Sequence, residues 1–228
     1  KLTATAKKDI QNRLLSKYCV VGMQAVFMDP EFVNVEMTVY AKVDSKKTNK
    51  TFGQIEKEIT DVILEYNSTS LNVFDNILSD VTLMNDIKES VSAIKSCYSK
   101  KTINKDQTII YGAEIENELF VGNPILPGVK SVLFRYDTND CYFADENGIV
   151  YIYKNSNNTK LLIKPFGRVD YVKGIVYYQF PRYGVMKQND FGTSGIINFT
   201  MTPVNPDIET YLQNIVRITK IRVVLTNA

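Results

Sequence analysis

The sequence predicts an α+β protein, in which a small α/β sandwich is followed by a β-rich, meander-like domain. One observation is a stretch, residues 33–43, that alternates strictly between apolar and other residues. Two later stretches, residues 52–66 and 80–89, place their apolar residues three or four positions apart. From about Tyr111 the helical spacing disappears, and short strands alternate with turn residues. A mixed first half followed by a strand-only second half favours the α+β class.

The first element is expected to be an amphipathic helix over residues 4–17. Ile10, Leu14 and Leu15 lie on one side of such a helix, and many of its other positions are polar. We expect the apolar side to pack against another part of the protein.

A β-hairpin is expected next, with residues 23–28 as its first strand. Asp29 and Pro30 favour a tight turn after it, because proline fixes its own φ near about −65°. The second strand should bury one face and leave Phe32 and Tyr40 on the other. The buried face consists of every second residue: Val33, Val35, Met37, Val39, Ala41 and Val43.

Two helices and a strand complete the α/β sandwich. Thr51 and Gln54 have the spacing of a capping box, which predicts the start of a helix over residues 52–66. A second helix is expected around residues 80–89, and residues 92–103 read as a strand that returns to the sheet. We expect the helices to cover one face of this sheet.

The β-rich half is predicted from its turns. Asn147-Gly148 is the strongest hairpin signal in the chain, because Asn and Gly accept the positive φ of a type I′ turn. Gly167 and Gly174 bracket a strand, a tight turn and a second strand. The strands expected here are residues 131–136, 141–144, 149–154, 160–166 and 218–225. The expected domains are residues 1–110 and 111–228.

Composition excludes several classes of protein. The chain has 228 residues, of which 44% are hydrophobic and 23% charged, as in an ordinary globular protein. A net charge of +2 is too small to indicate a nucleic-acid partner. No apolar run reaches the ~18–20 residues of a membrane-spanning helix. Because the chain begins at Lys1 rather than Met, we expect a fragment or a processed product.

Residues suited to chemistry are scarce. The chain has no histidine, which removes the usual proton shuttle and the commonest metal ligand. Cys19, Cys97 and Cys141 are far apart in the sequence and show no C-x-x-C spacing, so we expect reduced thiols and no zinc site. The prediction is a protein that is not an enzyme and has no catalytic residue, cofactor or metal.

Aromatic residues are the more informative signal. The chain has 14 tyrosines and 11 phenylalanines. In the strand over residues 149–154, Tyr151 and Tyr153 share one face, and Val150 and Ile152 share the other. One face can be core, so the other needs a partner, which is either another protein or another part of the same domain. The expected interface residues are Phe32, Tyr40, Tyr151 and Tyr153.

Four passages together resemble the baseplate J-like family, specifically the wedge subunit of contractile-tailed bacteriophages. They are MDPEFVNVEMTVYAKV preceded by a helix, the capped helix that ends in Tyr66, FDNILSDVTLMNDIKESVSAIKS, and NPILPGVKSVLFRY followed by GRVDYVKGIVYYQF. Their order is similar to that in the carboxy-terminal half of such a subunit, and the likeness spans nearly the whole chain.

The resemblance implies a structural role without catalysis. Two copies of such a subunit pair within each wedge, and the wedges join into a six-fold ring that rearranges when the sheath contracts. The expected partners are therefore a second copy, neighbouring wedges and other baseplate wedge proteins. The expected location is the tail baseplate of the virion, after assembly in the host cytoplasm.

Two other classes remain open. A tail-associated module could bind carbohydrate or a receptor through aromatic strands, although the chain lacks tryptophan, the preferred sugar-stacking residue. A glycosidase would need two converging carboxylates. The pairs Asp29/Glu31 and Glu56/Glu58 instead fall beside a turn and on the polar side of a helix, where we expect a structural role.

Overall fold

The computed structural model divides the chain into two units, residues 1–31 and 32–228, and each is described by itself. The first contains helix α1 (Ala4–Arg13), none of whose residues is fully buried. The described residues are 3–13, 18, 31–109, 115–162, 164–182, 184–186, 195–210 and 214–228. The other parts of the predicted first helix and hairpin, namely Leu14, Leu15, residues 23–28, Asp29 and Pro30, lie outside the described residues.

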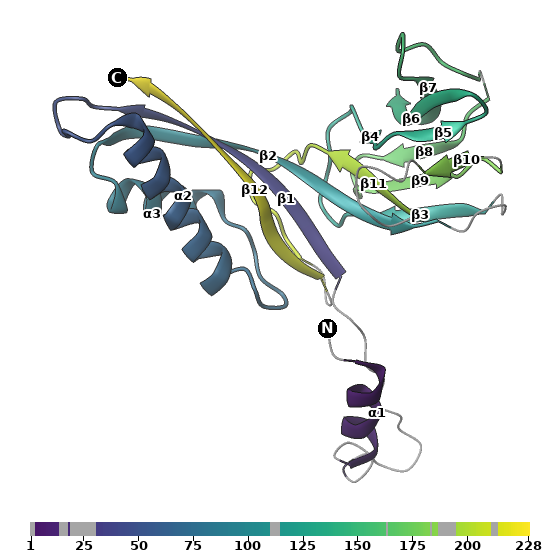
Figure 1. Cartoon of the computed structure of the whole chain (residues 1–228), viewed down its shortest axis with the longest axis horizontal. Helices are drawn as coiled ribbons and strands as arrows, with labels where there is room; N and C mark the ends of the chain where they lie inside the picture. The colour runs from purple at the N-terminus through teal and green to yellow at the C-terminus, as the bar shows by residue number, and fades with distance from the viewer. Residues whose placement is uncertain are drawn as a thin grey trace. The chain divides into compact units, whose positions relative to one another are not determined.

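Strand β1 (Glu31–Val43) has the predicted alternation of buried and half-exposed residues. All six apolar residues from Val33 to Val43 at odd positions are buried, which confirms this face of the strand. β1 pairs antiparallel with β2 (Ile94–Thr108), and its other neighbour is β12 (Asn214–Asn227). Figure 1 shows these three long strands side by side.

The carboxy-terminal strand β12 runs parallel to β1. The Arg217 Nε atom donates to the Asn34 side chain at 2.5 Å, and the Ala228 N–H donates to the Val43 carbonyl at 2.9 Å, so contacts advance along both strands together. The last strand, expected within the β-rich domain, therefore belongs to the sheet that contains β1. The predicted division into residues 1–110 and 111–228 remains a prediction, and β12 is the element that crosses it.

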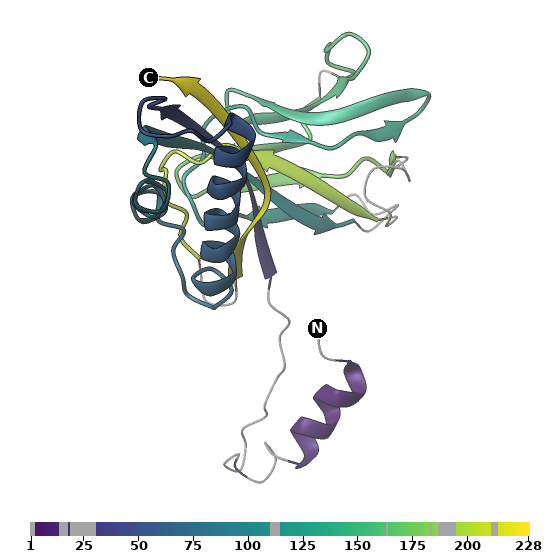
Figure 2. The same cartoon turned by 60° about the vertical axis from the view of Figure 1, so that its left-hand side comes forward.

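Helices α2 (Phe52–Thr69) and α3 (Asp80–Ser90) lie on the same side of this sheet, as expected (Figure 2). Thr51 and Gln54 form the predicted capping box: the Gln54 N–H donates to the Thr51 hydroxyl, and the Gln54 side chain accepts from the Thr51 N–H at 2.8 Å. The helices bury one stripe each: Ile55, Ile59, Ile63 and Tyr66 in α2, and Leu83, Met84 and Ile87 in α3.

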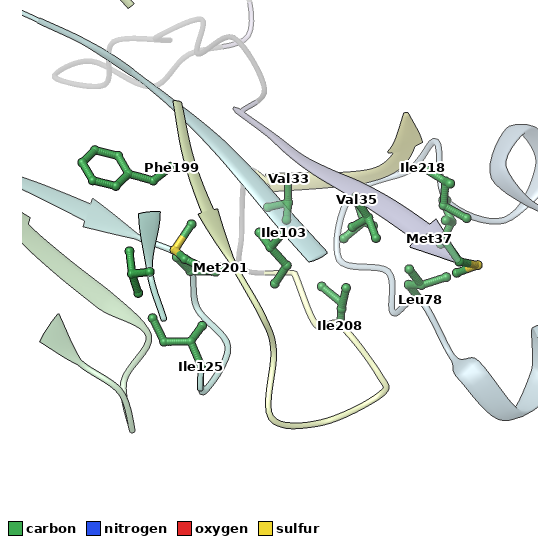
Figure 3. Close-up of a cluster of buried hydrophobic side chains, with 14 of the residues drawn as sticks. Val33, Val35, Met37, Leu78, Ile103, Ile125, Phe199, Met201, Ile208 and Ile218 are labelled. Carbon is green, nitrogen blue, oxygen red and sulfur yellow. The ribbon is translucent and has the colours of Figure 1, made fainter. Parts of the chain in front are cut away.

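The core fills the space between the sheet and its cover. Figure 3 shows Val33, Val35 and Met37 of β1 near Ile103 of β2 and Ile218 of β12. Leu78 and Ile208, from two connecting segments, are also fully buried and form an antiparallel β-bridge. Side chains from both halves of the chain thus contribute to one continuous cluster of buried residues.

The β-rich half is rich in strands, and five of them follow one another in the sheet. Each of these five strands pairs antiparallel with the next one in the series: β5 (Phe134–Tyr136), β6 (Asn139–Glu146), β7 (Ile149–Lys154), β8 (Gly167–Asp170) and β9 (Ile175–Gln179). β11 (Ile196–Met201) pairs with β2 and so joins the two halves into one mixed sheet. The remaining strands are β3 (Glu116–Phe120), β4 (Lys130–Ser131) and β10 (Gly184–Met186).

The predicted glycine turns are present. Asn147 and Gly148 have φ values of 53° and 80° and join β6 to β7, which is the backbone of a type I′ hairpin. Gly167 begins β8 and Gly174 precedes β9. A Cβ atom on Gly174 would lie 1.9 Å from the Asn123 carbonyl oxygen, so no other residue fits there without a shift of the backbone.

Two predicted strands are not continuous: residues 131–136 divide into the end of β4 and β5, and residues 160–166, as far as the structure describes them, form no strand. Among the described residues of 160–166, only Lys160 forms a bridge, with Tyr153. The segment does contact β7, because Leu161 N–H donates to the Ile152 carbonyl and Phe166 N–H donates to Val150. Pro165 has no N–H, which prevents a continuous ladder between these two points.

Aromatic side chains form the core of the β-rich half. Phe143 of β6 lies at the centre, with its ring centroid 5.6 Å from that of Tyr178 and 6.0 Å from that of Phe199. The ring centroids of Tyr178 of β9 and Phe199 of β11 also lie 4.8 Å apart, although four strands separate β9 from β11 in the sheet order, so this part of the sheet curls around one core. The aromatic core residues of this half are Phe134, Phe143, Phe166, Tyr178, Phe180 and Phe199.

Candidate functional site

The candidate functional sites are exposed surfaces of the chain. Within the described part of the chain, no three His, Cys, Asp or Glu residues are placed to hold a metal ion. No described helix is long and apolar enough to cross a membrane. Glu56 and Glu58 lie along one helix, where Glu58 pairs with Lys50 at 2.5 Å, so they do not converge on a cleft.

The described cysteines are poor nucleophiles. Cys141 is buried, Cys97 is half-buried, and both thiols are free. Burial raises the pKa of each thiol, so the reactive thiolate is disfavoured at neutral pH. Cys19 lies outside the described residues.

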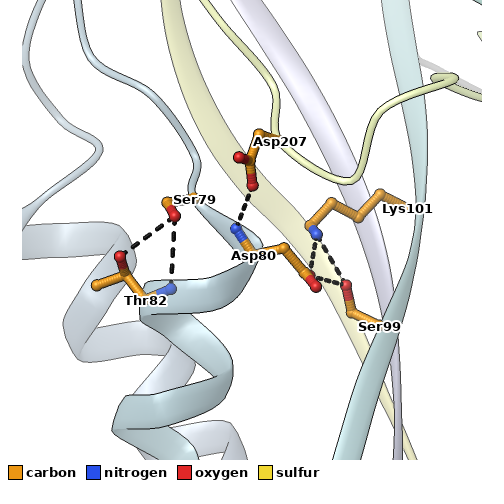
Figure 4. Close-up of polar contacts among 6 residues, drawn as sticks. All are labelled: Ser79, Asp80, Thr82, Ser99, Lys101 and Asp207. Atoms are coloured by element: carbon orange, nitrogen blue, oxygen red, sulfur yellow. Dashed lines mark hydrogen bonds and ion pairs between the residues drawn. The ribbon is translucent and has the colours of Figure 1, made fainter.

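A buried lysine that the sequence analysis missed lies at the junction of three segments (Figure 4). The side chain of Lys101 is 2% exposed. Its ammonium group pairs with Asp80 and donates to the Ser99 hydroxyl at 2.8 Å. The Asp80 backbone N–H donates to the Asp207 carboxylate at 2.7 Å. These bonds hold together three segments: β2, the start of α3 and the segment before β12.

This cluster is better suited to structure than to catalysis. Burial lowers the pKa of Lys101, whereas the adjacent Asp80 carboxylate opposes that shift. A lysine that activates a serine must be neutral, and an ion pair with Asp80 favours the protonated amine. Lys101 lies opposite the core residue Met37 in the β1–β2 register, so the signal in the sequence was a lysine at a core-facing position of the strand.

The predicted interface residues of β1 lie on the face that the helices do not cover, which we call the open face. Tyr40 stacks on Tyr98 of β2 with ring centroids 4.9 Å apart and 10° between the planes. Tyr98 is 56% exposed. Phe32 lies under the Arg217 guanidinium, 4.3 Å from its ring centroid. The open face comprises Phe32, Asn34, Glu36, Thr38, Tyr40 and Lys42 of β1, with Asn104, Thr102, Lys100, Tyr98 and Ser96 opposite the last five.

The start of β1 on the open face borders a polar groove. Its side chains bond one another across the strands: the Asn198 amide donates to Asp106 at 2.8 Å, and the Thr200 hydroxyl donates to Asn104 at 2.9 Å. Arg217 reaches Asn34 in the same way. The groove is therefore a hydrogen-bonded surface in which most polar groups already have partners.

Tyr151 and Tyr153 lie on a separate surface, on the outer side of β7. Tyr153 stacks against Tyr142 of β6 at 5.8 Å, and the Lys160 ammonium lies 3.8 Å from the centroid of the Tyr151 ring. The Tyr153 hydroxyl donates to Glu146 at 2.9 Å. Burial is the main cause that raises the pKa of Tyr153 to about 12, and this hydrogen bond is the second. The chain's own loop thus covers part of this face, and the structure does not bring the four predicted interface residues into one site.

A group of exposed apolar residues that the sequence analysis missed extends from the connection between α2 and α3 into the first turn of α3. Val73, Phe74, Ile77 and Val81 are 51%, 53%, 48% and 66% exposed, and we call these four residues the apolar patch. The sequence signal was an apolar connection, LNVFDNIL, between two helices that are already amphipathic. Val81, in the first turn of α3, is an apolar residue of this helix that points to solvent.

Comparison with known proteins identified no family. No protein-family model matches the chain. A search of curated proteins found no match either.

Proposed function

We propose that this chain is a structural component of a contractile phage tail baseplate wedge, which mediates subunit dimerisation and ring assembly. The observation that carries the proposal is the exposure of two kinds of contact surface on one scaffold: the apolar patch and the open face with its Tyr98 ring. The sequence resemblance supplies the class of assembly, and these surfaces supply the means to bind copies and neighbouring wedge proteins.

The apolar patch is the surface that favours pairing of two copies. The patch has four large apolar side chains within nine residues, and each is about half exposed to water. Burying such apolar area is the main favourable term in association. A patch that contacts its own copy across a two-fold axis buries twice that area in one contact. The outer face of β7, with Tyr151 and Tyr153, and the open face then remain for other neighbours.

Immunogold labelling tests the proposal directly. Antibodies raised against the chain are expected to label the baseplate end of contractile-tailed particles that encode it, in negative-stain electron micrographs. Antibodies against a capsid protein serve as the control. Labelling of another part of the particle, or none on particles whose baseplates are open to antibody, would overturn the proposal.

A carbohydrate- or receptor-binding module is the alternative, because the polar groove offers amides, carboxylates and an arginine next to an aromatic ring. Against it, Arg217 covers one face of the Phe32 ring, and sugar stacking needs a free aromatic face. Saturable binding on a glycan array that Asn104→Ala abolishes, while Asn85→Ala leaves it intact, would favour this alternative. Asn85 is an exposed residue of α3, on the other side of the sheet.

A further inference from the structure

Part of the open face, next to the end of β1, is cationic. Lys42 and Lys100 are exposed there beside the Tyr98 ring, and Lys100 lies 5.7 Å from the centroid of the Tyr40 ring. Arg222 of β12 faces the same way, because its neighbours Ile221 and Val223 pack against the core. The β1–β2 pairs of this region are Thr38 with Lys100, Tyr40 with Tyr98 and Lys42 with Ser96, and none of these residues is acidic. We call Lys42, Tyr98, Lys100 and Arg222 the cationic patch.

The opposite side of the same layer carries a groove with negative charge. Glu65 of α2 and Asp86 and Glu89 of α3 line it, and Val62 and Tyr66 provide its apolar part. None of the three carboxylates bonds or pairs with another side chain in the part of the chain that the structure describes. The last turn of α2 has no basic residue, so the negative end of its dipole adds to the charge of the groove. We call this feature the acidic groove.

We propose that the cationic patch of one copy docks on the acidic groove of a second copy. Charge complementarity between the two features argues for this occupant, because Lys42, Lys100 and Arg222 surround an exposed ring, and the three carboxylates of the groove surround Val62 and Tyr66. Tyr98 supplies the apolar part of the patch, and Val62 and Tyr66 receive it. The partner is therefore another copy of this chain, bound through its helices.

The placement of the two features fixes the type of contact. Helices α2 and α3 cover one face of the sheet, and the cationic patch lies on the other face. Such a contact is head to tail, so repetition closes into a ring or continues as a filament. This contact, which rests on the proposed function, would join one pair of copies to the next, whereas the apolar patch would join the copies within a pair.

Sedimentation velocity in two salt concentrations tests the contact. In about 0.1 M salt, where the Debye length is about 10 Å, species larger than a dimer are expected; in about 0.5 M salt they should dissociate. The double variant Lys100→Glu/Arg222→Glu should weaken formation of the larger species at least about tenfold. Lys164→Glu/Lys173→Glu changes the net charge equally at exposed positions of the β-rich half and should associate like the wild type.

A complementary variant makes the test independent of any loss of folding. Glu65→Lys/Glu89→Lys alone should also lose the larger species. An equimolar mixture of this variant with Lys100→Glu/Arg222→Glu should recover them, because each variant retains one intact half of the contact. Recovery by mixing cannot arise from unfolded protein.

Three results would overturn the inference. One is wild-type association by Lys100→Glu/Arg222→Glu or by Glu65→Lys/Glu89→Lys, and another is a mixture of these two variants that stays dissociated. The third is salt-sensitive binding of a labelled single-stranded oligonucleotide of about 20 residues, abolished by Lys100→Glu/Arg222→Glu, without self-association, which would assign the patch to nucleic acid. None of these results affects the baseplate labelling, so failure of this contact and failure of the proposed function remain distinguishable.

Discussion

The side-chain amide of Asn67 bonds both backbone polar groups of Ile218. Its Nδ2 atom donates to the Ile218 carbonyl at 3.3 Å, and its Oδ1 atom accepts from the Ile218 N–H at 2.8 Å. Ile218 belongs to β12, the strand at one end of the sheet order, so these backbone groups have no strand beside them among the described residues. A helix residue thus takes the place of a neighbouring strand and ties α2 to the carboxy-terminal strand.

Replacing Asn67 with Ala should lower the free energy of unfolding by about 1–3 kcal/mol, because two partly buried backbone groups lose their partner. Urea unfolding followed by circular dichroism measures the change. Asn85→Ala, at an exposed position of α3, should have an effect within about 0.5 kcal/mol. Equal effects of the two substitutions would show that the amide of Asn67 contributes nothing.

Charge introduced into the buried face of β1 tests the register of the sheet. Val35→Asp or Val39→Asp places an unpaired carboxylate at a fully buried position, which should cost several kcal/mol, on the order of the whole stability of a domain. Thr38→Asp lies on the open face opposite Lys100 and should change stability by less than about 1 kcal/mol. Thermal melts that ranked these variants in the reverse order would contradict the assigned face.

Removing one charge of the Lys101–Asp80 ion pair should destabilise the protein more than removing both charges. Asp80→Ala leaves a buried ammonium without its carboxylate and should destabilise the protein by about 3–5 kcal/mol. The double variant Asp80→Ala/Lys101→Met removes both charges and should recover most of that loss, because a methionine fits a buried, apolar position. Denaturant unfolding of the two variants measures the difference. A double variant no more stable than Asp80→Ala would show that the charge of Lys101 is not the cause.

Tyr178 should make the protein sensitive to alkali. Its hydroxyl is buried and has no hydrogen-bond partner among the residues that the structure describes, and burial raises the pKa of the phenol well above its ordinary value of 10.0. The unfolded chain therefore loses this proton at a lower pH than the folded protein, so the contribution to stability is complete below pH 10 and declines as the pH rises further. Tyr178→Phe should unfold less readily above that pH and be at least as stable at neutral pH.

Unfolding by urea at pH 8 and at pH 11 measures this difference, because the first pH lies below the ordinary phenol pKa of about 10 and the second lies above it. An alkaline profile that is the same for Tyr178→Phe and the wild type would refute the prediction.

The parts of the fold that the sequence predicted depend on local patterns. The alternation from Val33 to Val43 reports burial directly, because a strand exposes successive residues on opposite faces. The Thr51 cap and the Asn147-Gly148 turn are set by neighbouring backbone groups. Each of these features involves residues close in the chain, so no knowledge of tertiary pairing was needed.

The features that the sequence did not predict depend on distant pairing. β12 lies beside β1 in the sheet although nearly the whole chain separates them in sequence, and no local pattern in either strand indicates that the two pair. Tyr98 becomes a surface residue opposite Tyr40 only through the β1–β2 register. Lys101 is buried because Asp80 of α3 reaches it, which a strand pattern alone cannot indicate.

Self-association through the apolar patch is the prediction closest to function. The chain should form a two-fold dimer in a concentration-dependent equilibrium, because its apolar patch can contact itself and a two-fold axis is the commonest closed symmetry. The contact should persist in about 0.5 M salt, where the Debye length falls to about 4 Å, because apolar contacts are not screened. Sedimentation equilibrium at several concentrations measures both properties.

Phe74→Asp should abolish this dimer, since the charge would be buried without a partner in the contact. Val172→Asp changes an apolar residue that is 81% exposed in the β-rich half, and the dimer should survive it. A chain that stays monomeric at every concentration, or a dimer equally sensitive to both substitutions, would rule out pairing through the apolar patch.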